Sequence, residues 1–195
     1  MKQPYTFILL LLFFSAAAVN AQTLNYDVYY GDSQVGSMKV EKKSDGEKIV
    51  LHSHGKVTLS LIFTLELEFI HHAEFREGGL LSSLSKNLRG GDLTDMSSGY
   101  QNGSLYQNRV NDEVRKMNLP IQFTVLSMYF AEPLGLKNIY SERTGTLLPV
   151  RQTSSSHYEV TQYNGHKTRY VYQNGIVKLM EVDHSIATLQ FRLRN

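Results

Sequence analysis

Histidine is the side chain of this sequence that offers the most chemistry, and four histidines lie in two close groups. His52 and His54 are two residues apart, so both rings would point to the same side of a β-strand. That spacing can hold a metal ion when a third ligand comes from elsewhere. His71 and His72 are adjacent and would point to opposite faces. Because the chain has no cysteine and no His-Glu-x-x-His motif, we expect half-exposed strand histidines, no metal site and no cofactor.

Serine and glutamate clusters offer hydrolysis and acid–base catalysis. The serines at 154–156 precede His157, but a Ser–His pair must meet through space, and neighbours along a chain rarely do so. No Gly-x-Ser-x-Gly motif is present. Glu66 and Glu68 would solvate the polar face of a strand unless one of them were buried with a raised pKa. We therefore expect no catalytic residue and no enzyme.

One further group of charged residues lies in an irregular segment of the chain. Glu132, Glu142 and Arg143 follow the predicted helix described below. Loops on a rigid scaffold often carry function. A salt bridge that fixes this crossover segment is the simpler interpretation, and we prefer it.

The elements that must position these side chains are β-strands. Asn164-Gly165 and Asn174-Gly175 separate runs rich in Tyr and Val. Asn-Gly favours the two-residue hairpin turn because both residues tolerate positive φ. These turns predict an antiparallel meander of four strands, Tyr158–Tyr163, Lys167–Gln173, Ile176–Val182 and Ile186–Arg194.

The longest alternation of apolar and polar residues runs from Val57 to Phe69. Every odd position is apolar and most even positions are polar. A period of two excludes the stripe of an amphipathic helix. A single strand of this length would reach roughly 40 Å at about 3.3 Å per residue, which is long for a globular protein. We therefore predict one long strand that curves with its sheet.

A short helix is predicted over residues 121–130. Pro120 suits the first helical turn, and Val125, Met128 and Tyr129 fall on one apolar face. So short a helix persists only when it packs against other elements. The fold class we predict is mostly β, either a curved antiparallel sheet or a partly closed β-barrel, with this helix packed on the apolar face.

The N-terminus has the three parts of a secretory signal peptide. Lys2 precedes an apolar run from Phe7 to Phe14, and small residues follow as far as Ala21. The run is shorter than the roughly 20 residues that span a bilayer. We therefore expect a signal peptide over residues 1–21, cleavage after Ala21, and a periplasmic or secreted protein that is not an integral membrane protein after cleavage. Residues 22–195 would form a single antiparallel β domain.

Composition narrows the class of partner. The chain has 20 Lys and Arg against 18 Asp and Glu, a net charge of +2. Since no dense basic cluster is present, the charge gives no basis for binding nucleic acid. Without cysteine the protein is stabilised by burial and hydrogen bonding alone, which suits a bacterial periplasm or cell exterior better than a eukaryotic secretory route.

Six short motifs are distributed along most of the chain. They are Tyr-Asp-Val-Tyr at 26–29, Gly36, Leu-Pro-Ile at 119–121, Met-Tyr-Phe-Ala-Glu-Pro at 128–133, Ser-Glu-Arg-Thr-Gly at 141–145 and Tyr-Val-Tyr-Gln-Asn-Gly at 170–175. Together they resemble an uncharacterised family, a domain of unknown function, of exported proteins from Gram-negative bacteria. The chain is similar, more loosely, to another uncharacterised periplasmic family. The resemblance implies an all-β, half-barrel-like fold. It implies no known activity, so it assigns no catalytic or binding residue.

Two functions of different kinds stay open. The first is a non-enzymatic envelope protein that binds a lipid or other apolar ligand, because a concave sheet covered by a helix can enclose an apolar cavity. The second is a structural module with a filled core that binds an envelope protein partner; a hydrolase is least favoured. A cavity beneath residues 121–130 would distinguish the first two. The predicted ligand-binding residues are Leu61, Phe63, Leu65, Leu67, Phe69, Val125, Met128 and Tyr129.

Overall fold

The computed structural model describes residues 20–60, 64–118, 120–183 and 188–194. These residues form fourteen β-strands and one short 3-10 helix. The elements are β1 (Asn20–Tyr30), β2 (Ser33–Asp45), β3 (Lys48–Ser60), β4 (Thr64–Arg76), β5 (Gly79–Arg89), β6 (Asp92–Asn102), β7 (Leu105–Val110), β8 (Glu113–Asn118), η1 (Leu126–Tyr129), β9 (Asn138–Ser141), β10 (Thr146–Ser154), β11 (His157–Thr161), β12 (Lys167–Gln173), β13 (Ile176–Asp183) and β14 (Thr188–Leu193).

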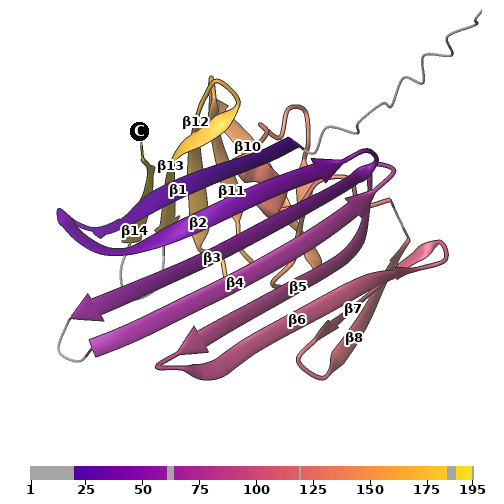
Figure 1. Ribbon diagram of the computed structural model, residues 1–195, viewed down its shortest axis with the longest axis horizontal. Helices are drawn as coiled ribbons and strands as arrows, with labels where there is room; N and C mark the ends of the chain where they lie inside the picture. Colours follow the sequence, from indigo (N-terminus) through magenta and orange to yellow (C-terminus); the bar gives the residue numbers. More distant parts are fainter. Residues whose placement is uncertain (1–19, 61–63, 119, 184–187, 195) are drawn as a thin grey trace, which may run out of the picture.

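All fourteen strands belong to one antiparallel sheet with the order β8-β7-β6-β5-β4-β3-β2-β1-β14-β13-β12-β11-β10-β9. Two meanders, β1–β8 and β9–β14, join where β1 pairs with β14. Figure 1 shows the first meander as a front layer with the second behind it, so the sheet bends back on itself. Its edges, β8 and β9, do not pair with each other. The predicted curved antiparallel sheet is therefore confirmed, and it is open.

The predicted C-terminal meander is also confirmed. Asn174 and Gly175 join β12 to β13 with φ angles of 54° and 76°. Both residues thus adopt the left-handed conformation that a two-residue hairpin turn requires. The four strands expected from the Asn-Gly turns are β11, β12, β13 and β14, which lie in this order across the rear layer.

The single long strand predicted over residues 57–69 is wrong. The segment is a hairpin, with its first part in β3 and its last part in β4. Val57 lies opposite Leu67, and Leu59 lies opposite Leu65. Since cross-strand partners share a face, the odd-numbered side chains still point to one side of the sheet. The reversal was missed because the segment contains no Gly, Pro, Asn or Asp to signal a turn.

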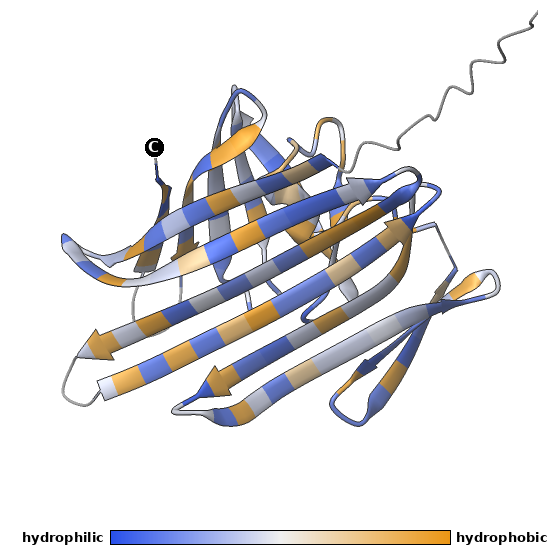
Figure 2. Ribbon diagram, viewed as in Figure 1, coloured by the Kyte–Doolittle hydropathy of each residue, from blue (hydrophilic) through white to orange (hydrophobic). Residues whose placement is uncertain are grey.

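The inner face of the sheet carries the core. Figure 2 shows apolar and polar residues alternating along the strands of the front layer, as a sheet with one buried face requires. In β3 the side chains of Leu51, Val57 and Leu59 are buried, while their even-numbered neighbours point outward. The rear layer contributes apolar groups such as Val177 and Met180. The two layers thus face each other across a shared interior.

The helix predicted over residues 121–130 is wrong in its first part, because residues 121–124 are not helical. Only η1 is helical, and it is a single 3-10 turn. Thr124 pairs in parallel with Tyr140 of β9, and the Ile121 carbonyl accepts a hydrogen bond of 2.8 Å from the Leu80 amide. A short segment with β-branched residues gains more from these edge contacts than from an isolated helical turn. We call residues 121–131 the plug, because they lie between the layers.

Side chains of the plug fill the interior as predicted for the apolar face. Leu126, Met128 and Tyr129 are buried. The Tyr172 hydroxyl of the rear layer donates a hydrogen bond of 2.9 Å to the Met128 carbonyl. The Tyr129 hydroxyl points at the sulfur of Met180, 3.5 Å away. The plug is therefore bound to the rear layer by hydrogen bonds as well as by packing.

The open seam between β8 and β9 is bridged by side chains. The Asn108 amide donates to the Tyr140 hydroxyl at 3.0 Å, and the Arg115 guanidinium donates to the Thr144 carbonyl at 2.9 Å. Gly145 packs against Asn108 so closely that a Cβ would lie 2.0 Å from the amide oxygen, and its φ of +63° also favours glycine. The two edges therefore stay together without a backbone ladder.

Because neighbouring strands are antiparallel, the turns gather at two opposite ends of the half-barrel. One end carries the turns that follow odd-numbered strands, and we call it the β9–β10 end. It includes the β9–β10 and β11–β12 turns. Turns that follow even-numbered strands, including the β4–β5 turn, lie at the β4–β5 end. The plug separates the interior near one end from the interior near the other.

Candidate ligand-binding cavities

The predicted ligand-binding residues lie mostly in the packed core. Leu61 and Phe63 are outside the described residues. Leu65 is buried, and Leu67 is half-buried beside it. Phe69 is half-buried and packs edge-on against Phe191, with ring centres 6.0 Å apart. This part of the predicted site is occupied by the protein's own side chains.

The predicted residues of the plug have different surroundings. Met128 is fully buried at 0% exposure, and Tyr129 packs edge-on against Tyr26 with ring centres 5.7 Å apart. Val125 and Tyr129 also line a cavity at the β9–β10 end, described below. The ligand-binding role of the eight residues stays a prediction, and of the six that the structure describes, Val125 and Tyr129 line the same cavity.

An apolar pocket lies beneath the plug at the β4–β5 end. We call it the Phe130 pocket, and its volume is about 180 Å³. Its walls come from the inner faces of β2, β3 and β4 and from the plug. They consist mainly of aliphatic and aromatic side chains: Ile49, Leu51, Phe75, Phe123 and Phe130. Leu65, Leu67 and Phe69, which were predicted to line a cavity beneath residues 121–130, lie nearer the opposite end of β4.

One cation belongs to the Phe130 pocket. Lys42 lies on the inner face of β2, in phase with the buried Met38 and Val40. Its ammonium group lies 6.0 Å from the centre of the Phe130 ring. Among the described residues it forms no ion pair. The alternation of Met38, Val40 and Lys42 along β2 is the sequence signal that places Lys42 on the inner face.

A second, more polar cavity lies on the other side of the plug, at the β9–β10 end. We call it the Glu142 cavity, and its volume is about 170 Å³. It is enclosed by β4, the η1 turn of the plug, the β9–β10 turn, the β11–β12 turn and the end of β13. Its polar groups include His71, Ser141, Glu142, Arg143 and Thr168. Convergent polar groups in an enclosed space make it a second candidate site.

Glu142 is the most deeply buried acid of the Glu142 cavity. Its side chain is only 2% exposed, and its Oε1 accepts a hydrogen bond of 3.2 Å from the Leu126 amide at the start of η1. Burial raises the pKa of Glu142 to about 7, although hydrogen bonds from Thr124 and nearby amides oppose the shift. A salt bridge was the expected role of this segment, but Glu142 instead links the β9–β10 turn to the plug.

His71 and Arg143 form the other titratable part of the Glu142 cavity. His71 points inward, in phase with Leu65, and burial lowers its pKa to about 4, with a smaller contribution from the Arg143 guanidinium. Arg143 forms an ion pair of 2.9 Å with Asp95 of β6. The predicted salt bridge of Arg143 therefore exists, but its partner is distant in sequence. No sequence signal pointed to Asp95.

Most of the remaining catalytic candidates have structural partners. His157 Nδ1 lies 2.7 Å from the Ser155 carbonyl oxygen, so this ring contacts backbone rather than a serine hydroxyl. Glu66 is exposed on the outer face. Glu68 forms an ion pair of 2.7 Å with His54, and Glu132 accepts a hydrogen bond of 3.1 Å from a tyrosine. None of these contacts assembles a nucleophile with a base.

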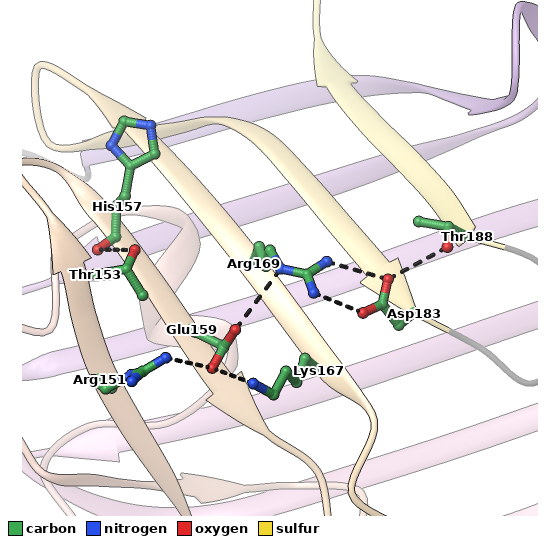
Figure 3. A network of polar contacts seen from close by, with 8 residues as sticks. All are labelled: Arg151, Thr153, His157, Glu159, Lys167, Arg169, Asp183 and Thr188. Carbon is green, nitrogen blue, oxygen red and sulfur yellow. Dashed lines mark hydrogen bonds and ion pairs between the residues drawn. The ribbon is translucent and has the colours of Figure 1, made fainter.

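A chain of ion pairs crosses the outer face of the rear layer (Figure 3). Glu159 is contacted by Lys167 at 2.9 Å, by Arg151 at 3.1 Å and by Arg169 at 3.7 Å. Arg169 also reaches Asp183 at 3.1 Å. The Lys167 and Arg151 contacts hold the pKa of Glu159 below its usual value. Because both oxygens of Glu159 are already paired, this network ties β10 to β13 together rather than offering a ligand site.

Two other findings limit the candidate chemistry. Within residues 20–60, 64–118, 120–183 and 188–194, no three His, Asp or Glu side chains are close enough as they stand to hold a metal ion. Over the same part of the chain, no helix has the length and apolar character needed to cross a bilayer.

Comparisons with known proteins show the fold and leave the activity open. A family model, DUF6134, described as a domain of unknown function, matches residues 26–194. Among solved structures, the crystal structure of a beta-barrel-like protein of domain of unknown function DUF1849 from Brucella abortus superposes with a TM-score of 0.62 and 11% identity. The match covers 92% of this chain and 98% of that chain. The search of curated proteins found no match.

Proposed function

This chain belongs to the DUF6134 family of unknown function, and from that premise we propose that it is a non-enzymatic exported envelope protein that binds an acyl chain in the Phe130 pocket. The observation that carries the proposal is an apolar pocket beneath the plug with one cation beside it, Lys42, which forms no ion pair with the residues that the structure describes. An apolar wall with a single charge selects an anionic amphiphile such as a fatty acid.

The size of the pocket defines how much of the ligand it can hold. Engineered apolar cavities of about 150 Å³ accept a benzene-sized group. The Phe130 pocket, at about 180 Å³, is of this order. It therefore holds one end of a chain while the rest follows the protein surface. Half-buried side chains of the plug, Phe123 and Phe130, are placed to adjust around the ligand.

Export is part of the proposal and rests on the sequence. Lys2, the apolar run Phe7–Phe14 and the small residues before Ala21 have the order of a secretory signal peptide. Strand β1 begins at Asn20, so the predicted cleavage after Ala21 would remove the first two residues of this strand. Mass measurement of the mature protein from a Gram-negative host tests the cleavage point.

Binding is tested with a fluorescent fatty acid and paired lysine variants. Lys42→Gln removes the charge at the pocket, whereas Lys43→Gln removes the neighbouring charge on the outer face. We expect Lys42→Gln to weaken fatty-acid binding about tenfold, which corresponds to about 1.4 kcal/mol, and Lys43→Gln to leave it unchanged. A fatty alcohol of the same length should bind wild type and Lys42→Gln equally, because it carries no charge.

Native mass spectrometry supplies the contradicting outcome. Protein purified from a bacterial host should carry bound lipid under gentle conditions. A clean apo mass together with no displacement of the fluorescent probe would exclude the acyl-chain proposal.

The filled core favours a second candidate function, a structural module that binds an envelope protein. Met128 and Tyr129 pack as core side chains at the centre of the interior. Apolar side chains are also exposed on the outer face of β6 and β8, among them Tyr100 at 51% and Val114 at 45%. Crosslinking in intact cells that recovers a partner through Tyr100, from a protein that carries no lipid, would favour this function.

A further inference from the structure

Two histidines that are distant in sequence, His52 and His72, lie side by side on the outer face. His52 of β3 is the direct cross-strand partner of His72 of β4. Their ring centres are 6.4 Å apart, and both side chains are half-exposed. The spacing of two between His52 and His54 suggested a different pair. Strand register, rather than sequence separation, decides which imidazoles meet.

We propose that His52 and His72 bind one divalent transition-metal ion, of the class of Zn²⁺, Cu²⁺ or Ni²⁺. Neutral imidazole is a preferred ligand of these ions. Directly opposed residues of an antiparallel pair have Cβ atoms about 4.5–5.5 Å apart, so two imidazoles can converge on one ion above the sheet. The rigid β3–β4 ladder fixes both backbones, which leaves only side-chain rotation to complete the site.

The distances fit such a clamp. Zinc–nitrogen bonds of about 2.0–2.1 Å place two imidazole centres about 5 Å apart on a tetrahedral ion. The observed separation of 6.4 Å requires the rings to close by only somewhat more than 1 Å. Rotation of half-exposed side chains supplies a movement of this size without a change in the backbone. The rings are tilted by 57° to each other, so they are not stacked in a way that blocks an ion between them.

Carboxylates on neighbouring strands are placed to complete the coordination. Glu41 of β2 is the cross-strand partner of His52 on its other side. Glu74 follows His72 by two residues on the same face of β4. Each carboxylate now pairs with a lysine, Lys39 at 2.9 Å and Lys48 at 3.0 Å. The site is therefore a two-nitrogen clamp in which water or a released carboxylate supplies the other ligands.

His54 is a matched control within the same strand. It points to the same outer face as His52, but its Nε2 lies 2.7 Å from a Glu68 oxygen. Its cross-strand partner is Ile70, which offers no ligand. If exposure alone were enough for a histidine to bind metal, His54 would contribute as much to binding as His52. The clamp predicts that His54 contributes little.

The experiment uses tag-free protein and titration calorimetry with Zn²⁺ at neutral pH. We expect wild type to bind one ion per chain. The variants His52→Gln and His72→Gln should each weaken binding by about tenfold or more, and His54→Gln by less than about twofold. The proposal is overturned if the double variant His52→Gln/His72→Gln binds as tightly as wild type, or if His54→Gln loses as much affinity as the others.

A measurement on the unmodified chain keeps the test decisive if a variant folds poorly. Zn²⁺ should shift the imidazole NMR signals of His52 and His72 together and leave those of His54 in place. Electron paramagnetic resonance with Cu²⁺ should show two coordinated imidazole nitrogens. Unchanged ring signals at saturating Zn²⁺ would overturn the proposal without recourse to any variant.

Discussion

The Phe130 pocket and the Glu142 cavity have nearly the same volume, about 180 Å³ and about 170 Å³, yet their chemistry differs. The first has walls of aromatic and aliphatic side chains with a single lysine beside them. The second gathers a buried acid, a histidine and an arginine. Both lie against the plug, at opposite ends of one half-barrel. The plug therefore divides one interior into two compartments of different polarity.

The comparison shows how inner-face composition sets the electrostatics of each compartment. Among the residues that line the pocket, Lys42 is the one that carries a charge. In the cavity, desolvation pushes two groups toward their neutral forms, with the pKa of Glu142 rising to about 7 and that of His71 falling to about 4. We therefore expect apolar binding at one end and proton-linked stability at the other.

The largest expected effect on stability distinguishes the packed core of the plug from the wall of the Phe130 pocket. Met128→Ala removes a side chain at 0% exposure and should lower the free energy of unfolding by about 3 kcal/mol, through lost burial and the cavity left behind. Phe130→Ala removes a half-buried ring and should lower the free energy of unfolding by about half as much. Urea unfolding of both variants measures the difference. Equal losses would contradict the assignment of Phe130 to the wall of a pocket.

The next effect concerns the acid of the polar compartment. The pKa of Glu142 is raised from 4.5 to about 7, so its neutral form favours the folded state. This contribution is fully present below pH 4.5 and is lost as pH rises through 7. Glu142→Gln should therefore raise the free energy of unfolding above pH 7, by up to about 3 kcal/mol, and change little below pH 4.5. Urea unfolding across pH measures it.

His71 supplies the control with the opposite sign. Its pKa is lowered from 6.5 to about 4, so its neutral form also favours the folded state, but its contribution is present above pH 6.5 and lost as pH falls to 4. His71→Gln should reduce the loss of stability in acid. If Glu142→Gln and His71→Gln altered the pH profile in the same direction, the proposed division of charge would be wrong.

The smallest effect tests the link between the two ionisable groups. Arg143→Gln breaks a partly exposed ion pair with Asp95 and should change the free energy of unfolding by less than about 1 kcal/mol. Because the Arg143 charge helps to lower the pKa of His71, the same variant should raise that pKa. An NMR titration of the histidine ring measures the shift. An unchanged pKa would show that desolvation alone keeps His71 neutral.

Local patterns predicted much of the fold. The Asn-Gly turns identified the C-terminal meander, and alternation identified which side of β3 and β4 faces inward. Two predictions failed for physical reasons. The reversal within residues 57–69 has no turn residue to mark it, and the segment 121–130 gains edge hydrogen bonds that an amphipathic pattern cannot reveal.

The candidate sites were less predictable because their residues are distant in sequence. Lys42 of β2 contacts Phe130 of the plug, and Arg143 of the β9–β10 turn forms an ion pair with Asp95 of β6. The phase of His71 with Leu65 could have shown that it points inward. Nothing nearby in the sequence marked Glu142 as buried, because its surroundings come from the plug.

The sequence by itself determined that this chain forms an antiparallel β domain with one apolar face, because period-two alternation and glycine-containing turns act over a few residues. Only the tertiary structure decided where the faces meet. The join between β1 and β14, the path of the plug and the opposition of His52 and His72 depend on strand register and on contacts between distant segments. A shift of one residue would turn each of these side chains to the other face, and local spacing does not encode that choice.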